Sequence, residues 1–195
     1  TIVHRMKSDG AARQDMTIRV GEGALLEYLP DPLILFPGAQ FESKLRIVAE
    51  PSATAILCDA FTQHDSEEEG GRFARLASET RIERPNGTLV AFDRFDIDGE
   101  LGEAHLDGLA GTYPAHGTLM VVHDACPAEK MAAVLRDALA ECSGIYAGAS
   151  TLPQDSGAWV RILAVDGLAL RAALKATWIA ARLKVCGAAP AKRPK

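Results

Sequence analysis

The sequence predicts a mainly β protein with two α-helices in its C-terminal third. Three observations support this class. Short runs with apolar residues at alternate positions fill the first half of the chain, and that spacing is typical of half-buried strands. Glycines and prolines that favour turns separate these runs. Runs with apolar residues at helical spacing follow Pro127.

The strands are predicted in chain order at residues 15–20, 25–29, 33–36, 41–48 and 53–60. Proline lacks the N–H that a central strand needs, so Pro30 and Pro32 mark a corner between two strands. The pair Asn86-Gly87 lies between two further runs. It is typical of a type I′ hairpin turn, because both residues tolerate positive φ. The hairpin strands cover residues 78–84 and 88–93, and later strands cover 118–123 and 158–165.

The two helices have recognisable ends. Pro127 suits the first position of a helix that continues to about Cys142, and Gly144 follows its end. The second helix covers about residues 168–186, where Asp166 can cap the start and Gly187 the end. This last helix carries an apolar stripe and a basic stripe, made of Leu170, Leu174 and Trp178 and of Arg171, Lys175 and Arg182. The stretches 63–71 and 99–117 are predicted as loops.

Length and composition fit one folded domain. The chain has 195 residues, of which 48% are apolar and 24% charged, enough to bury a core and too apolar for general disorder. We expect one domain over residues 1–187 and a frayed tail over 188–195. No apolar run is long enough to cross a bilayer, and no secretory signal is visible. A cytoplasmic protein with reduced cysteines is therefore expected.

Charge is unevenly distributed along the chain. The net charge is −5, but residues 161–195 carry +7 and residues 1–160 carry −12. The overall acidity argues against a dedicated nucleic-acid binder. An acidic body with a basic end can dock on a complementary partner, although a solvated tail gives the same pattern.

Several enzyme classes lack their motifs. The sequence has no GxxxxGK[ST] phosphate loop, no GxGxxG between a strand and a helix, no HExxH and no GxSxG. The expectation is therefore a protein without catalytic residues. One alternative is a metal-dependent enzyme that uses His123 and Cys126, since imidazole and thiolate suit zinc or nickel. Against it, a closed metal site needs four ligands, and only Cys142 stands near these two in sequence.

Glu27 is a charged residue inside an apolar run. If its side chain faces the interior, the carboxylate needs a partner or a wet cavity; if the alternation points it outward, it is simply solvated. We treat Glu27 and the nearby Asp31 as candidate carboxylates of a hydrated cavity, because oxygen ligands of this kind bind hard and borderline cations with fast exchange.

Residues 24–39 read ALLEYLPDPLILFPGA, which strongly resembles the LEYLP-x-P-x-I-x-F-x-x-A signature of the UreD (UreH) urease accessory proteins. Ile2 to Arg5 resembles that family's strand ending in an aromatic residue and arginine, with His4 in place of the usual tyrosine. Residues 159–164 resemble its late V-R-x-L strand, and residues 178–182 the W-x-x-x-R of its last helix. The resemblance covers essentially the whole chain, apparently without the family's N-terminal part.

The resemblance implies a urease maturation factor. Such a protein is the scaffold of an accessory complex that delivers nickel to apo-urease, with UreF and UreG as further partners and a water-filled passage as the route. The implied fold is an elongated, β-helix-like stack of strands. The implied metal is transient nickel, with no tightly bound cofactor. Arg171, Lys175, Trp178 and Arg182 are the predicted partner-binding residues, and a generic β-rich binding module is a further alternative.

Overall fold

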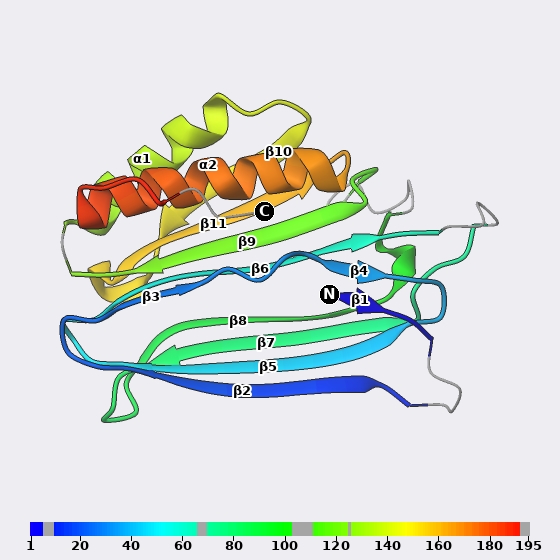
Figure 1. Cartoon of the computed structure of the whole chain (residues 1–195), viewed down its shortest axis with the longest axis horizontal. Coiled ribbons are helices and arrows are strands. Elements are labelled where there is room, and N and C mark those ends of the chain that lie inside the picture. Colours follow the sequence, from blue (N-terminus) through cyan, green and yellow to red (C-terminus); the bar gives the residue numbers. More distant parts are fainter. Residues whose placement is uncertain (6–9, 66–69, 103–110, 125, 192–195) are drawn as a thin grey trace.

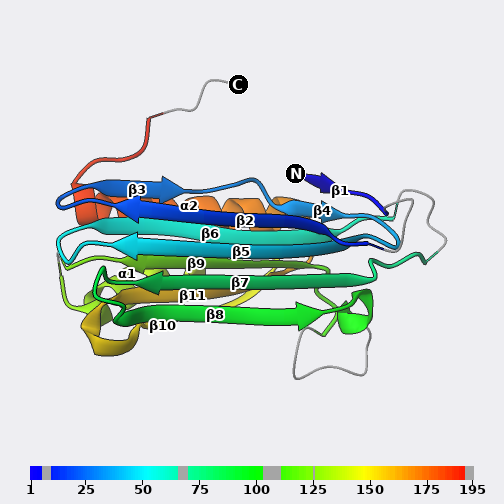
Figure 2. The ribbon, with the colours of Figure 1, turned by 90° about the horizontal axis from the view of Figure 1, so that it is seen from below.

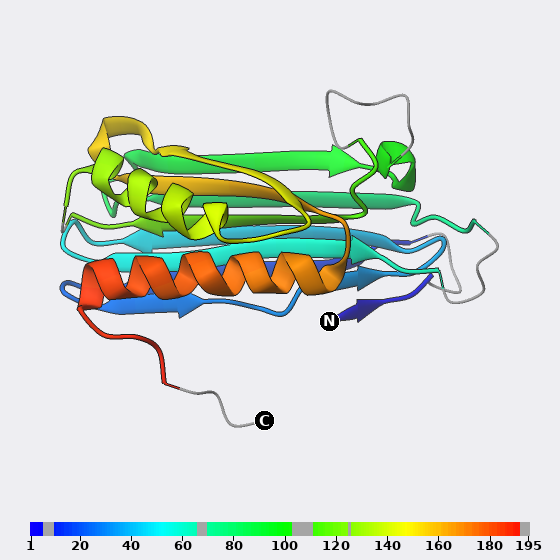
Figure 3. The same ribbon diagram turned by 90° about the horizontal axis from the view of Figure 1, so that it is seen from above.

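The computed structural model describes residues 1–5, 10–65, 70–102, 111–124 and 126–191, so the end of the predicted tail, residues 192–195, lies outside it. Two helices, a seven-stranded sheet and a four-stranded sheet form three stacked layers (Figure 1). Helices α1 (Ala128–Ala140) and α2 (Gly167–Cys186) both cover the same face of the larger sheet (Figure 3). We call the larger sheet the helix-covered sheet and the smaller one the outer sheet.

The helix-covered sheet has the order β1-β4-β6-β9-β11-β10, and β3 also pairs with β6. The outer sheet has the order β2-β5-β7-β8. The strands of the first sheet are β1 (Ile2–Val3), β3 (Leu25–Tyr28), β4 (Leu33–Leu35), β6 (Thr54–Gln63), β9 (Ala115–Val122), β10 (Ile145–Thr151) and β11 (Gly157–Ala164). Those of the second are β2 (Ala12–Val20), β5 (Gln40–Ala49), β7 (Arg75–Glu83) and β8 (Leu89–Ile97).

From β2 to β7 the chain winds like a β-helix. It passes from the outer sheet to the helix-covered sheet and back, and successive strands within each sheet pair in parallel. Met16, Leu45 and Thr80 mark one register row of the outer sheet. From β7 onward the pairing is antiparallel. This arrangement confirms the predicted mainly β class, the stacked strands and the two late helices.

The structure corrects two local predictions. Strand β10 was not predicted, because its run of small residues at a sheet edge gives little alternation. The β7–β8 turn is not type I′, since Gly87 has positive φ but Asn86 does not. Pro85 explains the difference, because its fixed φ suits the second position of a type I turn. The Gly87 N–H closes that turn on the Arg84 carbonyl at 2.9 Å.

The ends of helix α2 follow the sequence prediction, whereas Pro127 is the N-cap of α1 and not its first helical residue. Asp166 Oδ1 accepts the Ala169 N–H at 2.7 Å at the start of α2, and Gly187 ends the helix with φ 67°. Asp155 Oδ1, from a distant turn, accepts the Ala128 N–H at 2.7 Å at the start of α1. Neither described helix combines the length and the apolar character required for crossing a membrane.

Three apolar clusters form the core. One lies between the helices and their sheet and contains residues such as Leu135 and Leu170. The other two lie between the sheets, one around Ile47 and Met120 and the other around Phe61 and Leu76. A band of polar side chains separates these two clusters and forms the candidate site.

Candidate functional site

A polar band crosses the interior between the two sheets. On the helix-covered sheet, Asp59, Thr118 and Arg161 are register neighbours on β6, β9 and β11. The facing strands of the outer sheet contribute Ser78 and Thr80 on β7 and Asp93 on β8. Each of these residues belongs to the inward-facing positions of its strand, because side chains alternate between the two faces of a sheet.

Two polar contacts in this band join the sheets. The Ser78 hydroxyl donates to Asp59 Oδ2 at 2.6 Å. Arg161 Nη2 donates to both carboxylate oxygens of Asp93, at 2.9 and 3.0 Å. The Arg161 guanidinium also lies 4.8 Å from the centroid of the Trp159 ring. The band therefore contains a carboxyl with a neutral partner and, next to it, a carboxylate with a cationic partner.

Asp59 lines cavities on both of its sides. One, of about 60 Å³, reaches toward β2 and β3 and is also lined by Gln14, Tyr28 and Asp31. The other, of about 200 Å³, reaches toward β8 and β11 and is also lined by Arg161. A buried water needs about 30 Å³ of liquid volume and two to four polar partners, so both cavities have room for water beside Asp59.

A third cavity continues the polar interior toward one end of the sandwich. It has a volume of about 390 Å³ and shares Phe61 and His116 with the cavity beside Arg161. His116 stacks on Phe61 with 4.7 Å between ring centroids, and its Nε2 lies 2.9 Å from the Tyr113 carbonyl oxygen. Burial lowers the pKa of His116, which favours a neutral imidazole in this wall.

Burial dominates the electrostatics of Asp59. It raises the pKa of this carboxyl above the ordinary value of 3.8, and repulsion from Asp93 raises it further. The hydrogen bond from Ser78 opposes the shift without cancelling it. Asp59 therefore keeps its proton up to a higher pH than an exposed aspartate does.

The carboxylate and hydroxyl groups that line this band are separated from one another and do not form a cluster. Asp31, Asp59 and Asp93 are distributed along it, and within the described part of the chain no three His, Cys, Asp or Glu residues gather as a metal site. Oxygen ligands of this kind accept hard and borderline cations. The arrangement can contact a cation step by step, whereas a resident metal needs several ligands at once.

Glu27 does not share the cavity of Asp31, contrary to the predicted hydrated pair. It points to the opposite side of the sheet, where Trp178 Nε1 donates to its Oε1 at 2.6 Å. Arg182 forms an ion pair with its other oxygen. The carboxylate of Glu27 therefore joins β3 to helix α2. The structure thereby brings together one candidate metal-binding residue and two candidate partner-binding residues.

The other two candidate partner-binding residues have a different environment. Arg171 and Lys175 are exposed on α2, while Leu170 and Leu174 of the same helix are buried against the sheet. The predicted basic stripe is thus exposed at Arg171 and Lys175 but half-buried at Arg182.

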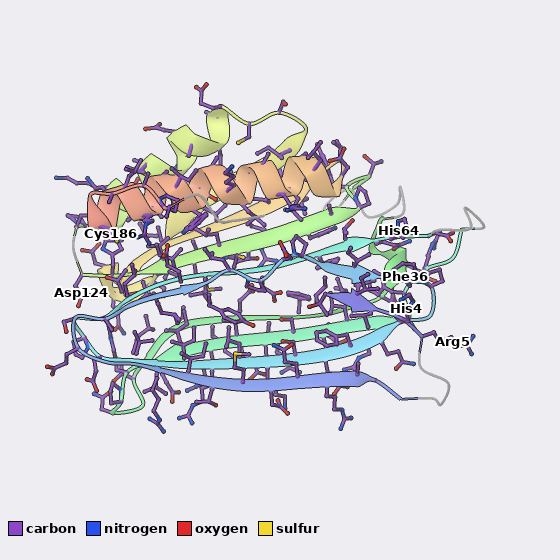
Figure 4. The ribbon with its side chains drawn as sticks, in the orientation of Figure 1. His4, Arg5, Phe36, His64, Asp124 and Cys186 are labelled. Carbon is purple, nitrogen blue, oxygen red and sulfur yellow. The ribbon has the colours of Figure 1, made fainter. Side chains whose placement is uncertain are left out.

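His4 and His64 lie at one end of the molecule, and Asp124 and Cys186 lie at the other (Figure 4). At one end, the ring centroid of Phe36 is 4.4 Å from that of His4 and 5.1 Å from that of His64. At the other end, the Sγ of Cys126 is 3.9 Å from Nε2 of the fully buried His123. The predicted neighbours His123 and Cys126 do meet, but the described residues add no third ligand. None of the four cysteines forms a disulfide.

Sequence reasoning did not assign the central residues of the band. Asp59 offered one signal, a charged residue inside the buried run of β6. Ser78, Asp93 and Arg161 resemble ordinary polar residues of half-exposed strands, and only the stacking of the sheets turns them inward.

The chain matches the family described as UreD urease accessory protein over residues 1–195. It is 38% identical to urease accessory protein UreD 1 of Pseudomonas syringae pathovar tomato, over the whole chain and 68% of that relative. The corresponding protein of Pseudomonas syringae pathovar syringae is 36% identical with the same coverage. UreD 1 of Methylorubrum extorquens is also 36% identical, over the whole chain and 65% of the relative.

The contact between Glu27 and α2 gives a stability prediction. Glu27→Gln removes the charge that Arg182 faces, and a half-buried donor that loses its partner costs about 1–3 kcal/mol. We expect the free energy of unfolding, measured by urea denaturation, to fall by that amount. Asp31→Asn, at an exposed neighbouring carboxylate, is the control and should change it by less than about 0.5 kcal/mol. Equal effects of the two substitutions would contradict the proposed anchoring role of Glu27.

The pKa of Asp59 gives a pH prediction. Because its pKa is raised in the folded state, the folded protein holds this proton more tightly, so the carboxyl destabilises the fold as pH rises above about 4. Asp59→Asn removes this titration. The unfolding free energy of Asp59→Asn minus that of the wild type should therefore increase with pH and level off above the folded pKa. A pH-independent difference would mean that Asp59 titrates in the folded protein as it does in the unfolded chain.

Proposed function

Because the chain belongs to the UreD family of urease accessory proteins, we propose that it acts in urease maturation, as a scaffold of the complex that delivers nickel to apo-urease. The observation that supports this most directly is the polar band, which leads from Asp31 past Asp59 to Arg161 with cavities on both sides of Asp59. The relatives carry the name of urease accessory proteins, and nickel is the cargo in this proposal.

The chemistry of the band suits transfer of nickel. Oxygen ligands bind this borderline cation less tightly than clustered imidazoles or thiolates, and the described residues offer no such cluster. A conduit must release its cargo, so single carboxylates with adjoining room for water are a favourable lining.

The remaining parts of the proposal concern partners and location. We assign apo-urease, UreF and UreG as partners, a cytoplasmic location and no catalytic turnover of the chain itself. Nickel is bound only transiently, and no resident cofactor is required. The alternative enzyme with His123 and Cys126 has less support, because that pair has no third described ligand and His123 is fully buried.

The conduit role predicts a defect that depends on nickel concentration. In the full-length protein, Asp59→Asn should lower urease activation severalfold at limiting nickel, because the substitution removes the central carboxylate of the band. Assembly with apo-urease, followed by size-exclusion chromatography, should stay normal. Asp137→Asn on the exposed face of α1 is the matched control. Full activation of the Asp59 variant at limiting nickel would reject the route along this band.

The exposed basic residues of α2 are the proposed docking site for UreF. Arg171 and Lys175 are available to a partner, whereas Arg182 is engaged by Glu27. Exposed charges at an interface mainly raise the association rate, and salt weakens the effect. A docking test should therefore reverse only the two exposed residues and leave Arg182 in place.

Arg171→Glu/Lys175→Glu should slow association with UreF, most strongly at low salt, as measured by surface plasmon resonance. The melting temperature should hardly change, because exposed charges contribute little to stability. Lys130→Glu/Arg136→Glu reverses two exposed charges on α1 and serves as the control. If both pairs affect UreF binding equally, the effect is general electrostatics and α2 is only structural.

A further inference from the structure

The outer face of the outer sheet is uncovered in the described part of the chain. Figure 2 views the molecule from this side, with β2, β5, β7 and β8 in front and no described element over them. Outward side chains form rows across these strands, as the register shows for Thr17, Arg46, Arg81 and Phe92. The two halves of this face differ in charge and in apolar exposure.

In one half of this outer face, a network of ion pairs balances the charges. Glu42 forms ion pairs with Arg13 at 2.9 Å and with Arg75 at 2.7 Å, and Arg75 also pairs with Asp96 at 2.7 Å. Two arginines and two carboxylates thus satisfy one another. An ion-pair network of this kind is ordinary on a solvent-exposed sheet. Its charges balance, so it offers no surplus charge to a partner.

The other half carries a surplus of positive charge. Here Arg46 and Arg81 share a single carboxylate, that of Glu83, to which their Nε atoms donate at 2.9 and 2.6 Å. Glu83 is 4% exposed, and both guanidinium groups hold its pKa below the ordinary value. Arg19 is exposed and forms no ion pair with any described residue. These three arginines and one carboxylate together carry a net charge of +2, on a body of residues 1–160 that carries −12.

Two large apolar side chains lie exposed on the same half. Phe92 is opposite Arg81 in the register and 48% exposed, and Leu89 is opposite Glu83 and 42% exposed. Phenylalanine and arginine are both enriched in protein interfaces. Planar guanidinium groups with spare N–H donors are suited to binding carboxylates. We call Arg19, Arg46, Arg81, Leu89 and Phe92 the arginine patch.

We propose that the arginine patch docks an acidic protein segment of a partner. Its carboxylates pair with the surplus guanidinium charge, and its apolar side chains pack on Phe92 and Leu89. Charge complementarity carries this assignment, because the neighbouring half of the same face is neutral and the patch is not. The patch lies on the face of the molecule opposite to α2 (Figure 1), so it is a second docking surface, and it does not depend on nickel transfer.

The test uses the full-length protein and a short fluorescent peptide of repeated Glu-Glu-Leu-Leu, with binding followed by anisotropy at low and high salt. Arg19→Glu/Phe92→Ser leaves both partners of Glu83 in place, so the fold should persist, and an unchanged melting temperature checks this. The variant should bind the peptide about tenfold more weakly than the wild type. The matched control, Arg13→Glu/Tyr146→Ser, alters one arginine and one exposed aromatic residue elsewhere and should bind like the wild type.

Three results would overturn the proposal. The wild type could fail to bind the peptide even at low salt. The control variant could weaken binding as much as the patch variant, which would show general electrostatic attraction. Finally, the patch variant could lose only self-association in analytical ultracentrifugation while peptide binding persists, which would assign the patch to a second copy of the chain. The peptide-binding test does not measure urease activation, so a failure of the proposed nickel route would not change its outcome.

Discussion

The half-buried carboxyl of Asp59, between two apolar clusters, is the constraint on which the rest of the structure depends. A carboxyl inside a β-sandwich is costly unless polar groups surround it. The facing sheet supplies the Ser78 hydroxyl, and the neighbouring Arg161 and Asp93 neutralise each other across the sheets. The two sheets are therefore held together by apolar packing toward both ends and by polar contacts in the middle. Cavities remain on both sides of Asp59.

The two helices supply part of the apolar core, which allows polar residues between the sheets. They cover one face of the larger sheet with the third apolar cluster, so the other face can contain a polar band without leaving the domain short of core. Glu27, Trp178 and Arg182 hold α2 in place from the strand that carries the most recognisable sequence motif. Within that motif, Glu27 contacts the last helix. Asp31 lines the cavity on the other side of the helix-covered sheet.

The proposed roles fall on different surfaces of the three layers. In these proposals the band between the sheets serves a small cation, the exposed basic residues of α2 serve one protein partner, and the arginine patch on the outer sheet serves an acidic segment. Because α2 and the patch lie on opposite faces, a scaffold built this way can hold two partners at once. The band lies in the layer between them, with the exposed residues Asp31 and Arg161 at its two ends.

The sequence by itself determined the mainly β class, nearly every strand and both helices, because alternation, caps and prolines are local signals. It also determined the family, since residues 24–39 form a long contiguous motif. Only the tertiary structure decided which polar residues face one another. Glu27 and Asp31 are four positions apart yet lie on opposite sides of a sheet, because strand β3 ends between them. Asp59 and Ser78 are brought together by a turn of the β-helix-like coil, and Asp93 and Arg161 by the stacking of two sheets. No local pattern encodes these distances, which is why the polar band appears only in the folded chain.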